Sequence, residues 1–92
     1  MKRFIIEREM PGIGSAERQA FREAAQKSNA VLGQLAPNVQ WVESYVTDDK
    51  IYCVYLATDE SVVRKHAELS GFPADKVIEV RRVLDPTAAM AA

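Results

Sequence analysis

Three glutamates and an arginine have the types and positions that could support chemistry. All four lie within predicted strands. Glu7, Glu43 and Glu79 lie among β-branched and apolar residues, and Arg81 follows Glu79 by two positions. Carboxylates and an arginine on one face could form an ion-pair network, a general base with a raised pKa, or hard ligands for a metal ion. Ion pairing is the favoured interpretation, because such networks are common.

A second candidate group is the single histidine, His66, with the single cysteine, Cys53. His66 shares a helical face with Val62, Val63 and Leu69, which predicts a buried side chain. A Cys–His pair suits a soft metal ion or an activated thiolate, but no CxxC, HxH or HExxH spacing supports a metal site. A hydrogen-bonded core histidine and a small buried cysteine are therefore favoured.

Length and composition indicate one small domain. The chain has 92 residues, 27% of them charged, and a formal net charge of −1. Without a basic excess, nucleic acid is not an expected partner. No apolar run approaches the roughly 20 residues that span a bilayer, so no membrane partner is expected either. A lone cysteine predicts the cytoplasm. We expect a single domain over 1–87 and a disordered tail over 88–92.

The elements that must position these residues follow from periodicity and breakers. Strands are predicted over 3–9, 39–47, 50–57 and 76–84, and helices over 16–35 and 59–70. Ser15 is the expected N-cap of the first helix. Thr58 or Asp59 should cap the second helix, and Gly71 and Pro73 should end it. The order β-α-β-β-α-β predicts an α+β, ferredoxin-like fold: a four-stranded antiparallel sheet with two helices on one face.

The sheet face opposite to the helices, called the bare face below, is the expected interface. An even-length turn at 48–49 would pair Ser44 with Cys53 and Val42 with Tyr55 toward the helices, whereas an odd-length turn would break this assignment. In the last strand, Ile78 and Val80 should face the helices, as should Phe4 and Ile6 in the first strand. The candidate ligand pocket or dimer face is then on the bare face and consists of Glu7, Trp41, Glu43, Tyr45, Tyr52, Glu79 and Arg81.

This face also includes Ile5, Val54 and Leu56, which makes it apolar for a surface in contact with water. Contiguous exposed apolar patches usually mark interaction sites. We therefore expect a homodimer that packs sheet against sheet with a polar pocket inside. The alternative is a solvated sheet face with scattered aromatic residues, since antiparallel sheets often have one face in water.

As a whole, the sequence resembles a known family over about residues 3–87. The segments that carry the resemblance are IIERE, KSNAVLGQL, VQWVESYVTDDKIYCVYLA and HAELSGFPADKV. They are similar to short bacterial proteins of unknown function, one branch of which is described as nickel-responsive or nickel-binding. The resemblance implies a ferredoxin-like fold of the dimeric α+β barrel type. It also implies Ni²⁺ or another divalent metal as a candidate cofactor. Besides the pair His66 and Cys53 named above, the candidate ligands are then His66 with Glu7, Glu43 or Glu79, which would have to come from two subunits because the expected faces put His66 and the glutamates on opposite sides of the sheet.

Three functions remain open at this point. The first is a small dimeric ligand-binding protein whose ligand is a divalent metal such as nickel or a small molecule. The second is a dimeric enzyme, monooxygenase-like or cyclase-like, with Glu7, Glu79 or His66 as its base. The third is a structural or regulatory interaction module. An enzyme predicts an enclosed pocket, and a metal site predicts ligand atoms within about 2.0–2.3 Å of one point.

Overall fold

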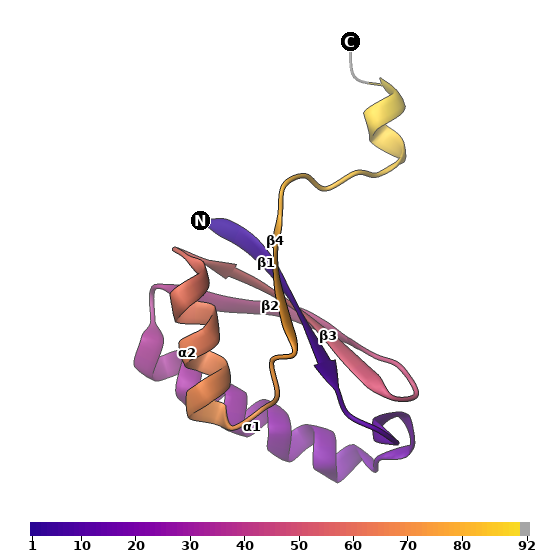
Figure 1. The fold of residues 1–92 in the computed structure, drawn as a ribbon, viewed down its shortest axis with the longest axis vertical. Helices are drawn as coiled ribbons and strands as arrows, with labels where there is room; N and C mark the ends of the chain where they lie inside the picture. Colours follow the sequence, from indigo (N-terminus) through magenta and orange to yellow (C-terminus); the bar gives the residue numbers. More distant parts are fainter. Residues whose placement is uncertain (91–92) are drawn as a thin grey trace.

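The computed structural model describes residues 1–90 and confirms the predicted order of elements (Figure 1). The structure also contains two short 3-10 helices, η1 and η2, which the sequence did not predict. The elements in chain order are β1 (Lys2–Glu9), η1 (Ile13–Ser15), α1 (Arg18–Leu35), β2 (Val39–Val46), β3 (Lys50–Ala57), α2 (Glu60–Ser70), β4 (Lys76–Val80) and η2 (Pro86–Met90).

The strands form one antiparallel sheet in the order β2-β3-β1-β4, and both helices cover the same face of it. β1 and β3 are the central pair, and each half of the chain contributes one central strand and one edge strand. This is the ferredoxin-like arrangement that the sequence predicts. No helix within residues 1–90 has the length and hydropathy needed to cross a membrane.

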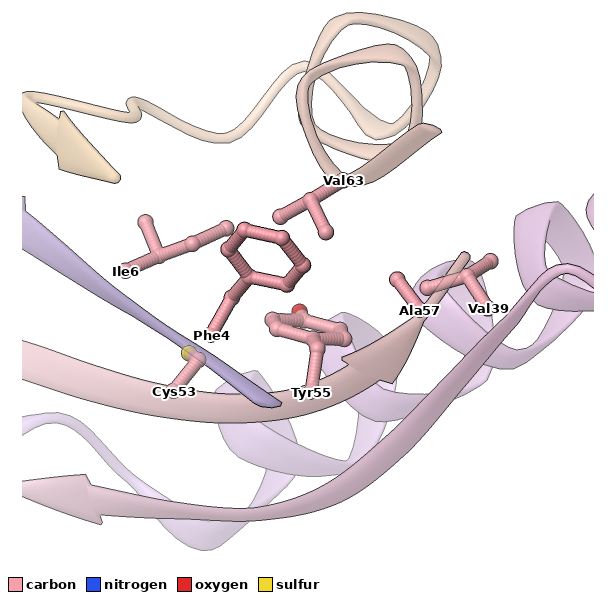
Figure 2. Close-up of a cluster of buried hydrophobic side chains, with 7 residues drawn as sticks. All are labelled: Phe4, Ile6, Val39, Cys53, Tyr55, Ala57 and Val63. Atoms are coloured by element: carbon pink, nitrogen blue, oxygen red, sulfur yellow. The ribbon is translucent and has the colours of Figure 1, made fainter. Parts of the chain in front are cut away.

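The hydrophobic core lies between the central strands and the two helices. Figure 2 shows Val63 of α2 pointing toward the rings of Phe4 and Tyr55. Each large apolar side chain buried this way contributes about 1.5–3 kcal/mol. Leu32 and Leu35 of α1 pack against the same cluster. The buried cluster consists of Phe4, Ile6, Val39, Cys53, Tyr55, Ala57 and Val63.

The ends of α2 follow the predicted cap chemistry. The Asp59 carboxylate accepts a hydrogen bond from the Val62 backbone N–H at 3.1 Å. Hydrogen bonds from Ser61 and Val62 lower the pKa of Asp59, because they favour its charged form. Gly71 ends the helix at φ 75°, in the left-handed region that glycine adopts without steric cost.

The start of α1 differs from the prediction that Ser15 is the N-cap. The helix begins at Arg18, with Glu17 as N-cap and no side-chain cap bond. Ser15 instead belongs to η1, and its hydroxyl donates a hydrogen bond to the Gly12 carbonyl at 3.0 Å. Serine satisfies local backbone groups in turns as readily as at helix ends, so its position alone could not distinguish the two.

A β-bulge in β2 corrects the predicted position of Trp41. Trp41 pairs with Tyr55 and Glu43 pairs with Val54, which leaves Val42 as an extra residue. One inserted residue reverses the alternation of faces. Trp41 therefore lies on the helix-facing side with Tyr55, and Val42 is 44% exposed. The pairs Ser44–Cys53 and Tyr45–Tyr52 lie between the bulge and the β2–β3 turn. The bulge does not affect them, and they keep their predicted faces.

The register of β4 corrects a second face assignment. Glu79 pairs with the buried Phe4, and Ile78 pairs with Ile5. Ile78 and Val80 thus belong to the bare face, and Glu79 lies on the helix-facing side of the sheet edge, contrary to the prediction for all three. Glu79 tolerates this place because β4 is an edge strand, where its side chain stays partly exposed and accepts from Arg81 at 3.1 Å.

β4 ends at Val80, four residues earlier than predicted, and the following segment leads away from the sheet and helices (Figure 1). Its apolar side chains are exposed, and Leu84 is 80% exposed. Residues 88–90, expected within a disordered tail, belong to η2. Ala91 and Ala92 of that expected tail lie outside the described residues.

Candidate functional site

A cavity of about 510 Å³ lies between α1 and the helix-facing side of the sheet and is called the α1 cavity below. Its lining is mostly apolar. Pockets of roughly 300–1,000 Å³ with this character are typical small-molecule sites. The lining residues are Arg8, Met10, Ile13, Ala20, Phe21, Ala24, Ala25, Ser28, Trp41, Ser44, Val46, Ile51, Cys53, Tyr55 and Phe72.

The first half of α1 presents mostly small side chains to the cavity, with Phe21 as the exception. Ala20, Ala24 and Ser28 recur every four residues and therefore lie on one helical face. The second half of the helix carries Leu32 and Leu35, which reach the core. Small residues cannot span the gap between helix and sheet, so the gap stays open beside the packed core.

The loop between β1 and α1 closes one end of the cavity. The Gly14 N–H donates to the Asp48 carbonyl at 2.9 Å. A Cβ on Gly14 would lie 2.7 Å from the Asp48 Cα, so this close approach needs glycine. The contact fixes the loop against the β2–β3 turn, and Met10 and Ile13 of the loop then border the cavity.

Arg8 supplies the charge of the α1 cavity and is only 2% exposed. Its guanidinium donates to Cys53 Sγ at 3.4 Å, to the Tyr55 hydroxyl at 3.3 Å and to the Pro73 carbonyl. Its Cζ lies 5.7 Å from the centre of the Phe72 ring, a cation–π contact. None of the ion pairs among residues 1–90 includes Arg8.

Ser28 connects the cavity to His66, which is fully buried behind it. The Ser28 hydroxyl and His66 Nε2 are 3.1 Å apart, and the His66 ring is tilted against Tyr55 with centroids 5.2 Å apart. Within the described residues, Nδ1 has no hydrogen-bond partner. Burial lowers the pKa of His66, and the positive charge of Arg8 lowers it further. Burial also raises the pKa of Tyr55 to about 12, so this phenol stays protonated.

The lowered pKa of His66 makes stability depend on pH. As the pH falls below the ordinary value of 6.5, the unfolded chain binds a proton that the folded chain does not. The free energy of unfolding should decrease toward acid by up to about 1.4 kcal/mol per pH unit, until the lowered pKa of the folded state is reached. Urea unfolding of the wild type and of His66→Gln would measure this, and the variant should lack the decrease. Equal slopes would contradict the assignment.

The residues predicted for the site do not form a single group. Trp41 and Cys53 line the α1 cavity. On the bare face, Tyr45 donates to Glu43, and Tyr52 pairs across the strands with both Tyr45 and Glu7. Glu7 lies 3.8 Å from each of two lysine ammonium groups, those of Lys50 and Lys76. Glu79 and Arg81 pair at the outer edge of the sheet.

The candidate metal ligands do not converge on one point, and the candidate bases lie outside the α1 cavity. No group of three His, Cys, Asp or Glu side chains within residues 1–90 could hold a metal ion. Cys53 Sγ accepts from the positively charged Arg8, which opposes a cation at the same atom. Residues 1–90 of a single chain therefore do not by themselves fit a nickel ion. Of the candidate bases Glu7, Glu79 and His66, none is a lining residue of the α1 cavity.

Sequence reasoning missed Arg8, Phe72 and the small residues of α1. A signal for Arg8 was present, because Phe4, Ile6 and Arg8 alternate and so share the buried face of β1. A charged residue that continues a buried alternation is informative, since charges are rarely buried without a reason. The alanine and serine spacing of α1 was a second signal.

Comparisons with known proteins agree with this fold. A family model described as nickel responsive protein, SCO4226-like, matches residues 4–80. The crystal structure of SCO4226 from Streptomyces coelicolor A3(2) superposes with a TM-score of 0.75 at 24% sequence identity and covers 89% of this chain and 99% of that chain. A comparison with curated proteins gives no match. The chain belongs to the SCO4226-like family of nickel-responsive proteins.

Proposed function

We propose that this protein is a small ligand-binding protein of the cytoplasm, which binds an apolar small molecule in the α1 cavity and acts as a homodimer. The observation that carries the proposal is the α1 cavity itself, about 510 Å³ with a mostly apolar lining and a few polar groups at its wall. A few polar groups in an apolar cavity orient a ligand, while the apolar surface supplies most of the affinity.

Trp41 gives a direct test, because it lines the α1 cavity and is the single tryptophan of the chain. Titration with octanamide, which is neutral and absorbs little near 280 nm, should change the Trp41 fluorescence in a saturable way. Burying the six methylenes and the methyl of octanamide at about 0.8 kcal/mol each sets the tightest expected Kd at about 0.1 mM, because association itself also costs free energy. A fluorescence that does not respond to octanamide or to its carboxylate analogue, octanoate, would contradict the proposal.

The homodimer part of the proposal is supported by the bare face. Ile78 is 51% exposed and Tyr45 is 55% exposed, and both lie on that face with the half-buried Ile5. A second copy would cover these side chains sheet against sheet, as expected for an apolar exposed patch.

Nickel is the second candidate ligand, and the family description and the unpaired Nδ1 of buried His66 favour it. Imidazole nitrogen suits nickel. Because residues 1–90 of one chain bring no three candidate ligands together, the remaining ligands would have to come from a second subunit or from the solvent. Calorimetric titration of chelator-treated protein with Ni²⁺ tests this. Saturable binding that is lost in His66→Ala would make His66 a ligand. Binding that survives this change would place the ion elsewhere.

A further inference from the structure

We propose that the ligand of the α1 cavity is an anion, a small carboxylic acid with an apolar body, whose carboxylate binds the guanidinium of Arg8. The inference rests on the ligand-binding function proposed above and adds the chemical class of the ligand. It assigns Arg8 as the residue that selects a negative charge.

The first argument is the burial of an uncompensated charge. Arg8 is 2% exposed, and none of the ion pairs among residues 1–90 includes it. Removing a cation from water costs several kcal/mol unless an opposite charge compensates it. A bound carboxylate would supply that charge at the wall of the cavity, where Arg8 is a lining residue.

The second argument is the hydrogen-bonding capacity that Arg8 retains. An arginine has five N–H donors, and its contacts with Cys53, Tyr55 and Pro73 use one each. The acceptors are a thiol sulfur, a hydroxyl and a backbone carbonyl, of which the sulfur is a weak acceptor. Two N–H groups remain for a ligand. A planar guanidinium matches a carboxylate in geometry as well as in charge.

The third argument is that the same contacts hold the guanidinium in place before any ligand binds. The Tyr55 hydroxyl contacts it from β3, and the Phe72 ring and the Pro73 carbonyl contact it from the loop between α2 and β4. A preorganised donor loses little side-chain entropy when it binds, which raises affinity. The apolar lining beyond it, including Phe21 and Ile51, would enclose the hydrocarbon part of the acid.

The test compares octanoate with octanamide, which have the same chain and differ in charge, with Trp41 fluorescence as the readout at pH 7. In the wild type, octanoate should bind about 10- to 100-fold more tightly than octanamide, the range for a hydrogen bond to a charged group. Arg8→Gln should remove this preference, so that the variant binds the two compounds with affinities within about threefold of each other. Arg82→Gln removes an exposed arginine outside the cavity and should keep the wild-type preference.

The outcomes separate this inference from the proposal on which it rests. Equal affinities of the wild type for the two compounds would overturn the assignment of Arg8 and leave the apolar cavity as a binding site. Failure of both to bind would overturn both proposals. Circular dichroism establishes whether Arg8→Gln is folded. If it is not, the wild-type ratio of the two affinities still decides the question, with a ratio near one overturning the inference.

Discussion

Ala24→Phe is expected to weaken octanamide binding by about 100-fold or more. Ala24 faces the sheet from the middle of the α1 cavity, so a phenyl ring at this position would occupy the space of the ligand chain. Losing about half of the apolar contact of an eight-carbon chain removes about 2.8 kcal/mol, which is a factor of about 100. Trp41 fluorescence titration of the wild type and the variant measures the difference.

The matched control for this change is Ala30→Phe, on the same helix. Ala30 is exposed and does not line the cavity. The control adds the same ring and should bind octanamide like the wild type. Thermal unfolding should show that both variants are folded, because the ring in Ala24→Phe enters space that is already open. Wild-type affinity in a folded Ala24→Phe protein would show that the ligand binds elsewhere.

Ile78→Glu is expected to convert the proposed homodimer into monomers. Ile78 lies on the bare face and is 51% exposed in the single chain, so the fold itself does not depend on its burial. In a sheet-against-sheet dimer, a carboxylate at this position would lose its hydration inside an apolar interface, at a cost of several kcal/mol per copy. Light scattering coupled to size exclusion should show twice the chain mass for the wild type and the chain mass for the variant.

Leu69→Glu is the control for the dimer prediction. Leu69 is an exposed apolar residue of α2, on the helical side of the molecule. The same change in charge at this position should leave the dimer intact. A monomeric wild type, or a dimeric Ile78→Glu protein, would contradict the predicted interface. Trp41 is unsuited to this test, because the bulge in β2 places it in the α1 cavity.

The sequence by itself determined the order and type of the elements. Alternating and helical periodicities are local signals, and they predicted all four strands and both helices. Asp59 and Gly71 marked the ends of α2, because cap chemistry depends on the nearest backbone groups. The alternation of Phe4 and Ile6 identified the buried face of β1. The resemblance over most of the chain also predicted the family.

The tertiary structure decided which residues share a face and which of them meet. A bulge is visible only when a strand is paired, and the extra Val42 reversed the side of Trp41. The register of β4 against β1 likewise placed Ile78, rather than Glu79, on the bare face. One position of shift changes the face of every following side chain, and the pattern of a single strand does not contain that shift.

The α1 cavity was also decided at the tertiary level. The sequence shows small residues on α1 and an arginine in β1, but burial depends on the distance between helix and sheet. Only the packed structure places Arg8 beside Tyr55 and Phe72 and leaves an open volume next to them. The periodicity of one element reports which side chains share its face, whereas a cavity is a property of the gap between elements that are distant in the sequence.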